Sequence, residues 1–256
     1  MYGKDFWLSS KRPNKIQRIV SCVPSQTEFL FALGLDSEIV GVTLFCVHPS
    51  EQAKTKTKIG GTKNLKIDKI LALKPDLVIG NKEENTKEQL ESIAAHIPVF
   101  VTDVHDFNSA LHSMNNLSLL VERPSIGEQI VGHIQKQFFQ IRQLKTFKVI
   151  YLIWHNPWMT VGGDTFINSM LNKAGFINCF EDRKRYPEID INEMIALDPD
   201  FLFLSSEPFP FRDKHEAELV TYFPPNRIKR VDGELFSWYG NRMSQSVVYF
   251  STRTFL

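Results

Sequence analysis

Two stretches of the chain decide its fold: IDKILALKPDLVI at residues 67–79 and INEMIALDPDFLFL at residues 191–204. They share a Pro-Asp pair, Pro75-Asp76 in the first copy and Pro199-Asp200 in the second, and the isoleucine, alanine and leucine positions before it also match. In each copy apolar residues at helical spacing lead to a proline, which ends a helix, and an apolar run typical of a strand follows. The two copies lie more than 100 residues apart, so the chain is predicted to contain a duplicated lobe and not a solenoid.

The segments around the first copy extend this pattern. A β-rich run from Ile16 to Val23 is stopped by Pro24, and Ser25 and Glu28 then have the spacing of a capping box. The helix that follows is predicted to stop at Gly34, which can take the left-handed conformation of a helix end. Further strands and helices alternate along both halves, and their continuous apolar strands suit a parallel sheet covered on both faces. The sequence therefore predicts an α/β fold with two similar Rossmann-like lobes.

One long amphipathic helix is predicted between the two lobes. Ser125 and Glu128 form a second capping-box pattern, and an apolar stripe follows at three- and four-residue steps: Ile126, Ile130, Ile134, Phe138, Ile141 and Leu144. Such a stripe alone also fits an ordinary packed helix, but its position between the copies favours a link. The predicted organisation is an arm at 1–15, a first lobe at 16–122, a linking helix at 123–146 and a second lobe at 147–256. A cleft between two lobes is a common place for a small ligand.

The composition excludes several classes of function. The chain has 256 residues and a net charge of +1, which gives no electrostatic case for nucleic acid or an anionic membrane as partner. No apolar run approaches the roughly 18 residues that a membrane span needs. The three cysteines make neither a disulfide framework nor a CxxC pair, and no HExxH or other motif with catalytic spacing is present. We therefore expect a protein that is not an enzyme and requires no cofactor.

The order RIVSCVPSQTEFLFALGL, VGVT, IGGTKNLKIDKILALKPDLVI, long helix and DINEMIALDPDFLFLSS resembles the substrate-binding proteins of ABC importers for cobalamin and iron–siderophores. In that family a single backbone helix joins the lobes. The resemblance covers roughly residues 16 to 245, and the cobalamin-binding branch is the most similar, because it also carries a Trp-containing ligand loop like FSWYGNR. It implies a monomer that captures a corrinoid or metal chelate between its lobes and delivers it to the permease subunits of an importer.

The resemblance also implies one exposed glutamate on each lobe that docks on arginines of the transporter. These positions fall on Glu28 in SQTEF and on Glu193 in DINEM. Glu28 is already explained as part of a capping box, and the two roles are compatible. Glu193 has the alternative of being a solvated helix residue.

Candidate ligand residues come from four loops that follow strands, since ligands of α/β proteins bind there. They are aromatic or basic side chains and two small turn residues: Phe45, His48, Gly61, Thr62, Trp154, His155, Trp158, Trp238, Tyr239 and Arg242. Aromatic faces suit a large flat macrocycle, and His48 and His155 are the weak candidates for ligating its metal. The alternatives are core packing for the tryptophans, hydrogen-bonded or surface positions for the histidines and a plain surface charge for Arg242.

The compartment is left open by the sequence. The family implies the periplasm or cell envelope, yet MYGKDFWLSSKRPNKIQRIVSC does not have the apolar region of a secretory signal. The alternative function is therefore a cytoplasmic metal- or cofactor-handling protein with the same fold and no transporter.

Overall fold

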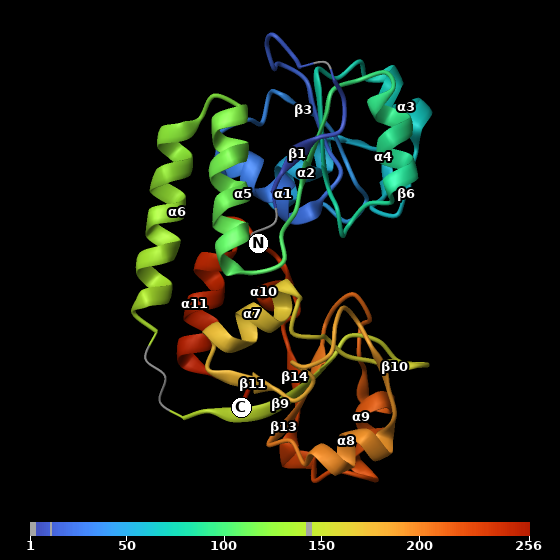
Figure 1. Cartoon of the computed structure of the whole chain (residues 1–256), viewed down its shortest axis with the longest axis vertical. Helices are drawn as coiled ribbons and strands as arrows, with labels where there is room; N and C mark the ends of the chain where they lie inside the picture. The colour runs from blue at the N-terminus through green and yellow to red at the C-terminus, as the bar shows by residue number, and fades with distance from the viewer. Residues whose placement is uncertain (1–3, 11, 142–144) are drawn as a thin grey trace. The chain divides into compact units, whose positions relative to one another are not determined.

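The computed structural model describes residues 4–10, 12–141 and 145–256, and the chain divides into two compact units. The first unit comprises residues 1–104, 108–134 and 239–242, and the second comprises residues 105–107, 135–238 and 243–256. Each unit is built on its own largely parallel sheet with helices packed against it (Figure 1). The predicted α/β class is confirmed.

The first unit contains a six-stranded sheet whose strands lie in the order β1-β8-β7-β2-β3-β4. Their bounds are Phe6–Trp7, Val99–Thr102, Leu77–Asn81, Ile19–Ser21, Ile39–Val42 and Thr57–Lys58. Every pair is parallel except β1 with β8. A small antiparallel pair is formed by β5 (Gly60–Gly61) and β6 (Asn64–Leu65). The N-terminal arm is thus not a free arm in its described part, because Phe6 and Trp7 add an edge strand to the sheet.

Four helices belong wholly to the first unit: α1 (Pro24–Ala32), α2 (Ser50–Thr55), α3 (Ile67–Ala72) and α4 (Lys87–Ala94). The capping box predicted at Ser25 and Glu28 is wrong. The helix begins two residues earlier than that pattern requires, at Pro24, and its N-cap is Val23, which makes no side-chain cap. Proline suits the first helical position because the N–H that it lacks would be unpaired there anyway. The predicted stop is confirmed, since Gly34 follows the end of α1 with a φ of 81°.

Helices α5 (Phe107–Leu120) and α6 (Pro124–Phe139) follow the first sheet along the chain, and the division between the units falls inside α6 after Ile134. This linking helix is shorter than predicted. After Phe139 the backbone tightens into three-residue steps, with Gln140 and Ile141 donating to the carbonyls three residues earlier, a common end for an α-helix. Ser125 lies inside the helix and is not its cap. Leu144, the last residue of the predicted stripe, lies outside the described residues.

The second unit contains a fully parallel four-stranded sheet in the order β11-β9-β13-β14. Its strands span Phe176–Asn178, Phe147–Leu152, Phe201–Ser205 and Ile228–Val231, and a separate antiparallel pair joins β10 (Trp158–Met159) to β12 (Glu188–Ile189). The helices are α7 (Phe166–Lys173), α8 (Ile191–Leu197), α9 (Asp213–Val220), α10 (Glu234–Ser237) and α11 (Met243–Thr252), with a 3-10 turn at Pro225–Arg227.

The duplicated sequence has the same local structure in both units. Helices α3 and α8 are followed by Lys74 and Asp198, both with positive φ, and then by the Pro-Asp pair. The Asp76 carboxylate accepts the backbone N–H groups of Gln17 and Arg18, both at 2.9 Å, just before β2. The Asp200 carboxylate accepts the N–H of Lys148 in β9 at 2.7 Å. Each aspartate thus ties the loop before one strand to the start of the neighbouring strand.

Each unit has its own apolar core beside its sheet. In the first unit buried residues of β2, β7 and β8 pack against α3 and α4, and Val20, Ile70 and Ile93 have no exposed surface. In the second unit β9 and β13 pack against α8 and α9 through residues such as Met194 and Leu219. These cores hold the strands, so the loops at their carboxyl ends start from fixed positions.

Candidate functional site

The predicted ligand residues lie mainly on loops that leave the carboxyl ends of parallel strands. Phe45 and His48 follow β3, Trp154 and His155 follow β9, and Trp238 follows β14 after the short helix α10. This edge of a parallel sheet is where α/β proteins bind their ligands. Each of the two units brings such a set of residues together.

In the first unit the loop after β3 presents apolar side chains to solvent. Phe45 is 59% exposed, and Leu44 and Val47 on either side are also exposed. Cys46 between them is buried, with its Sγ 3.2 Å from the hydroxyls of both Thr27 and Thr43. Burial raises the pKa of the Cys46 thiol, which is therefore neutral and serves as an anchor. A buried anchor inside an exposed segment holds Phe45 outward.

Gly61 and Thr62 lie beside this loop, in the hairpin of β5 and β6. A methyl group added at Gly61 would lie 3.3 Å from the Phe45 ring, so the ring packs directly against the glycine backbone. The carbonyl of Thr62 accepts a hydrogen bond of 2.9 Å from the Asn85 side-chain amide, which also binds the carbonyl of Cys22. The structure thus brings three of the predicted residues together, with Phe45 as the exposed ring.

In the second unit the loop between β9 and β10 carries Trp154, which is 41% exposed. The neighbouring His155 is half-buried, and its Nε2 lies 3.0 Å from a carboxylate oxygen of Glu218 on α9. Trp158 is buried in the core, stacked on Phe211 at 6.0 Å between ring centroids. Of the three predicted residues of this loop, Trp154 has an exposed ring. Trp158 instead packs in the core, which was the alternative considered for the tryptophans.

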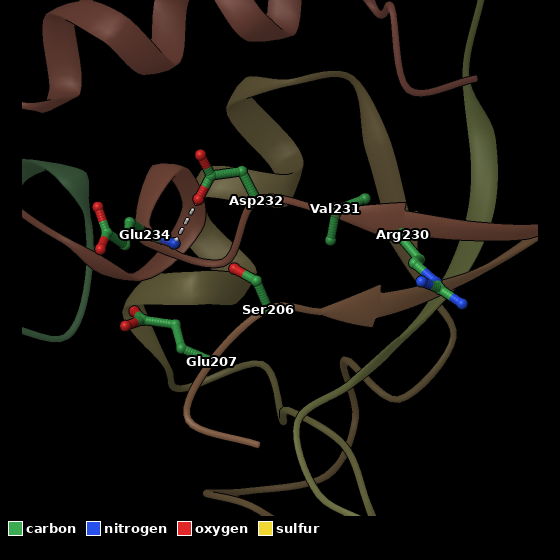
Figure 2. Close-up of a pocket in the computed structure, with 6 residues that line it drawn as sticks. All are labelled: Ser206, Glu207, Arg230, Val231, Asp232 and Glu234. Atoms are coloured by element: carbon green, nitrogen blue, oxygen red, sulfur yellow. Dashed lines mark hydrogen bonds between the residues drawn. The ribbon is translucent and has the colours of Figure 1, made fainter. Parts of the chain in front are cut away.

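Trp238 is buried at the end of α10, and its indole N–H donates to Glu207 at 2.9 Å. The hydroxyl of Ser237 donates to the same carboxylate. Glu207 follows β13 and lines an open pocket of about 520 Å³ with Ser206, Arg230, Val231, Asp232 and Glu234 (Figure 2). Glu207 is not apparent from the sequence, because nothing in SSEPFPF indicates that its carboxylate reaches a residue 30 positions further along.

The acidic side chains of this pocket come from the carboxyl ends of β13 and β14. Figure 2 shows the Arg230 side chain directed away from Glu207, Asp232 and Glu234. The guanidinium of Arg230 pairs instead with Asp213 and Glu216 on α9. The Asp232 carboxylate accepts the backbone N–H of Glu234, the first residue of α10, at 3.1 Å. The predicted ligand residues do not line this pocket.

Glu28 differs from its expected position on the surface. It is 7% exposed, and its carboxylate forms a bidentate pair with Arg242, with N–O distances of 2.8 and 3.1 Å. Both residues belong to the first unit, since residues 239–242 pack with α1. The expectation of an exposed Glu28 is therefore wrong, and so is the alternative of a plain surface charge at Arg242, because the two side chains pair in a buried place. The predicted role of Arg242 as a ligand residue stays a prediction. A docking role for Glu28 stays a prediction.

Tyr239, in the same segment, is buried beside Ser25 and Thr102. Burial raises the pKa of its hydroxyl far above the neutral range, so the group is uncharged. Tyr239 therefore contributes to the packing of residues 239–242 on the first unit. Its predicted role as a ligand residue stays a prediction.

Glu193 forms a capping box with Asp190 at the start of α8, a position at which none was predicted. The Asp190 side chain accepts the N–H of Glu193 at 2.9 Å, and the Glu193 carboxylate accepts the N–H of Asp190 at 3.1 Å. The same carboxylate pairs with Arg183, and its side chain is partly exposed. Glu193 therefore stabilises the start of α8, and its proposed contact with a transporter stays a prediction.

A resident metal centre has no ligand set in the described residues. No group of three or more His, Cys, Asp or Glu side chains among residues 4–10, 12–141 and 145–256 is arranged to hold an ion. His48 and His155 thus stay single candidates for contact with a metal in a bound chelate. In the part of the chain that the structure describes, helices are too short or too polar to cross a membrane.

A protein-family model described as periplasmic binding protein matches residues 19–221, nearly four-fifths of the chain. The chain belongs to the periplasmic binding protein family. The match includes both copies of the duplicated sequence and the linking helix between them. The family consists of binding proteins, as the resemblance implied, and this favours the binding-protein interpretation over that of a cytoplasmic handling protein.

Individual relatives agree with this assignment. The chain is 27% identical over 195 residues to the vitamin B12-binding protein of Vibrio campbellii, which covers 74% of this chain and 70% of the relative. Its fold is similar to that of the periplasmic vitamin B12 binding protein of Vibrio cholerae, with a TM-score of 0.80, 19% identity and coverage of 94% and 97%. It is also similar to a periplasmic heme-binding protein of Roseiflexus, with a TM-score of 0.79, 24% identity and coverage of 93% and 98%.

Proposed function

We propose that the protein captures a corrinoid, or another large metal chelate, and delivers it to an ABC importer without chemical change. The observation that carries the proposal is the pair of exposed aromatic rings, Phe45 and Trp154, each at the carboxyl edge of its parallel sheet. Several relatives with names stating vitamin B12 binding support a corrinoid as cargo. The partners are then the permease subunits, and the site of action is the periplasm or cell envelope, as for the named structural neighbours.

The chemistry of the two loops fits such a cargo. A macrocycle presents a broad, weakly polar face, and an aromatic ring can cover it with little loss of side-chain entropy. Phe45 and Trp154 each have an anchored neighbour, the buried Cys46 in one loop and the half-buried His155 in the other. The chain needs no cofactor of its own for this function, because the metal travels inside the cargo.

A thermal-shift screen tests the proposal. Purified protein is heated with cyanocobalamin, hemin or a ferric siderophore, and the variants Phe45→Ala and Trp154→Ala are tested in parallel. A ligand at 100 times its dissociation constant stabilises the native state by about 2.7 kcal/mol, enough for a clear shift. We expect a shift with cyanocobalamin that both variants reduce. A shift with hemin or the siderophore alone would replace the corrinoid by that chelate, and no shift with any of them would refute the proposal.

A further inference from the structure

The loop that carries Trp154 is closed by its own backbone. The N–H of Ile153 donates to the carbonyl of Met159 at 3.0 Å, and the N–H of Met159 donates to the carbonyl of Trp154 at 3.2 Å. These two bonds fix where the loop begins and ends. They do not fix how the residues between them lie on the rest of the unit, which requires a side-chain contact.

His155 supplies that contact. Its Nε2 lies 3.0 Å from Glu218 Oε2, and since a carboxylate only accepts, Nε2 carries the hydrogen. The His155 side chain is 14% exposed and the Glu218 side chain 44% exposed, so the bond is partly shielded from water. The His155 ring also packs edge-on against Trp158, with centroids 4.5 Å apart. The residue directly after Trp154 is therefore fastened to helix α9.

Trp154 itself is supported from one side. Its ring packs on Phe209 with centroids 5.4 Å apart, and Phe209 packs in turn on His215 of α9 at 5.0 Å. The residue nevertheless keeps 41% of its surface exposed to solvent. An exposed ring that is already held in one orientation binds a flat ligand with a smaller entropy loss than a mobile ring would.

We propose that Glu218 is a positioning residue for ligand binding: through His155 it holds the open face of Trp154 in the orientation that stacks on the cargo. This inference rests on the proposed function. In this inference His155 has a structural role. The hydrogen on its Nε2 is donated to Glu218, so that nitrogen is not available to a metal. Glu218 needs no contact with the cargo for this role.

A double-mutant cycle with cyanocobalamin as probe tests the inference. The variants are Glu218→Ala, Glu218→Gln, Trp154→Ala and the double variant with Ala at both positions, and Glu216→Gln on the same helix is the matched control. Glutamine keeps an oxygen that can accept from His155, so it should retain most of the wild-type affinity. We expect Glu218→Ala to weaken binding roughly two- to tenfold, a usual size for coupled positions. In the Trp154→Ala background it should have no further effect.

A second readout needs no ligand. Acrylamide quenching reports how open the tryptophans are, and Trp154 is more exposed than the buried Trp158 and Trp238. Glu218→Ala should increase quenching in the wild-type background and leave it unchanged when Trp154 is replaced by Phe. Unchanged quenching, unchanged affinity or an equal loss of affinity in the Trp154→Ala background would overturn the positioning role alone. A wild-type protein that binds no corrinoid would refute the corrinoid cargo itself, and with it this inference.

Discussion

Replacement of Glu28 by Ala should destabilise the first unit strongly. The change removes the carboxylate that Arg242 binds through two hydrogen bonds of 2.8 and 3.1 Å, and both side chains are only 9% exposed. The buried guanidinium then loses the bidentate contact with Glu28. Loss of one partner of a buried pair costs about 3–5 kcal/mol, whereas loss of an exposed pair costs at most about 1 kcal/mol.

Thermal unfolding and urea unfolding measure this effect. At about 2–4 °C per kcal/mol for a chain of this size, the melting temperature of the affected unit should fall by roughly 6–20 °C. Glu51→Ala in the same unit is the control, because the Glu51 and Lys54 side chains are 83% and 71% exposed. It should change stability by less than about 1 kcal/mol.

Two further variants separate the pair from the individual side chains. Arg242→Ala leaves Glu28 as the unpaired charge and should be about as harmful as Glu28→Ala. The double variant removes both members of the pair, so its loss should be clearly smaller than the sum of the two single losses. Two results would contradict a stabilising buried pair. One is a loss of stability for Glu28→Ala as small as that for Glu51→Ala. The other is a loss for the double variant equal to the sum of the losses for Glu28→Ala and Arg242→Ala.

Three other predictions concern both units. Burial, and then His155, lower the pKa of His215 below its ordinary value of 6.5, so the unfolded chain binds the proton more readily than the folded chain. The free energy of unfolding should therefore be highest above about pH 6.5 and fall on acidification. His215→Gln should flatten this pH profile in urea titrations between pH 5 and 8, and an unchanged slope would contradict the prediction. Asp76→Ala should lower the free energy of unfolding, measured with urea, by about 1–3 kcal/mol. The loss should exceed that of Asp200→Ala, because Asp76 accepts two backbone N–H groups and Asp200 accepts one. Equal losses for the two variants would contradict this prediction. Trp238→Ala should lower the affinity for cyanocobalamin by more than about 1 kcal/mol in calorimetry if its ring contacts the cargo, and unchanged affinity would leave it as a packing residue held by Glu207.

The fold was largely predictable because the sequence repeats itself. The Pro-Asp pairs at 75–76 and 199–200 marked the helix–loop–strand units, and Gly34 marked the end of a helix. The edge strand at Phe6–Trp7 was not predictable, since two residues carry no periodicity. The capping box at Ser25 failed because Pro24 itself takes the first helical position. Cap patterns are short, and a nearby proline decides which of two possible helix starts is used.

The candidate site was predictable as loops but not as contacts. The aromatic residues after strands correctly marked the carboxyl edges of the sheets. How each side chain is placed depends on partners far along the chain: Glu28 and Arg242 are 214 positions apart, and His155 and Glu218 are 63 apart. Neither pair has a spacing that a local pattern can show. The expectation of an exposed Glu28 failed for this reason, since its side chain was assessed without Arg242.

Calorimetric titration of the purified wild-type protein with cyanocobalamin tests the central claim most directly. We expect one corrinoid per chain with a dissociation constant of micromolar or tighter, about −8 kcal/mol or more favourable. The absence of binding heat at several temperatures, together with an unchanged melting temperature at saturating corrinoid, would contradict the claim that this periplasmic binding protein carries a corrinoid.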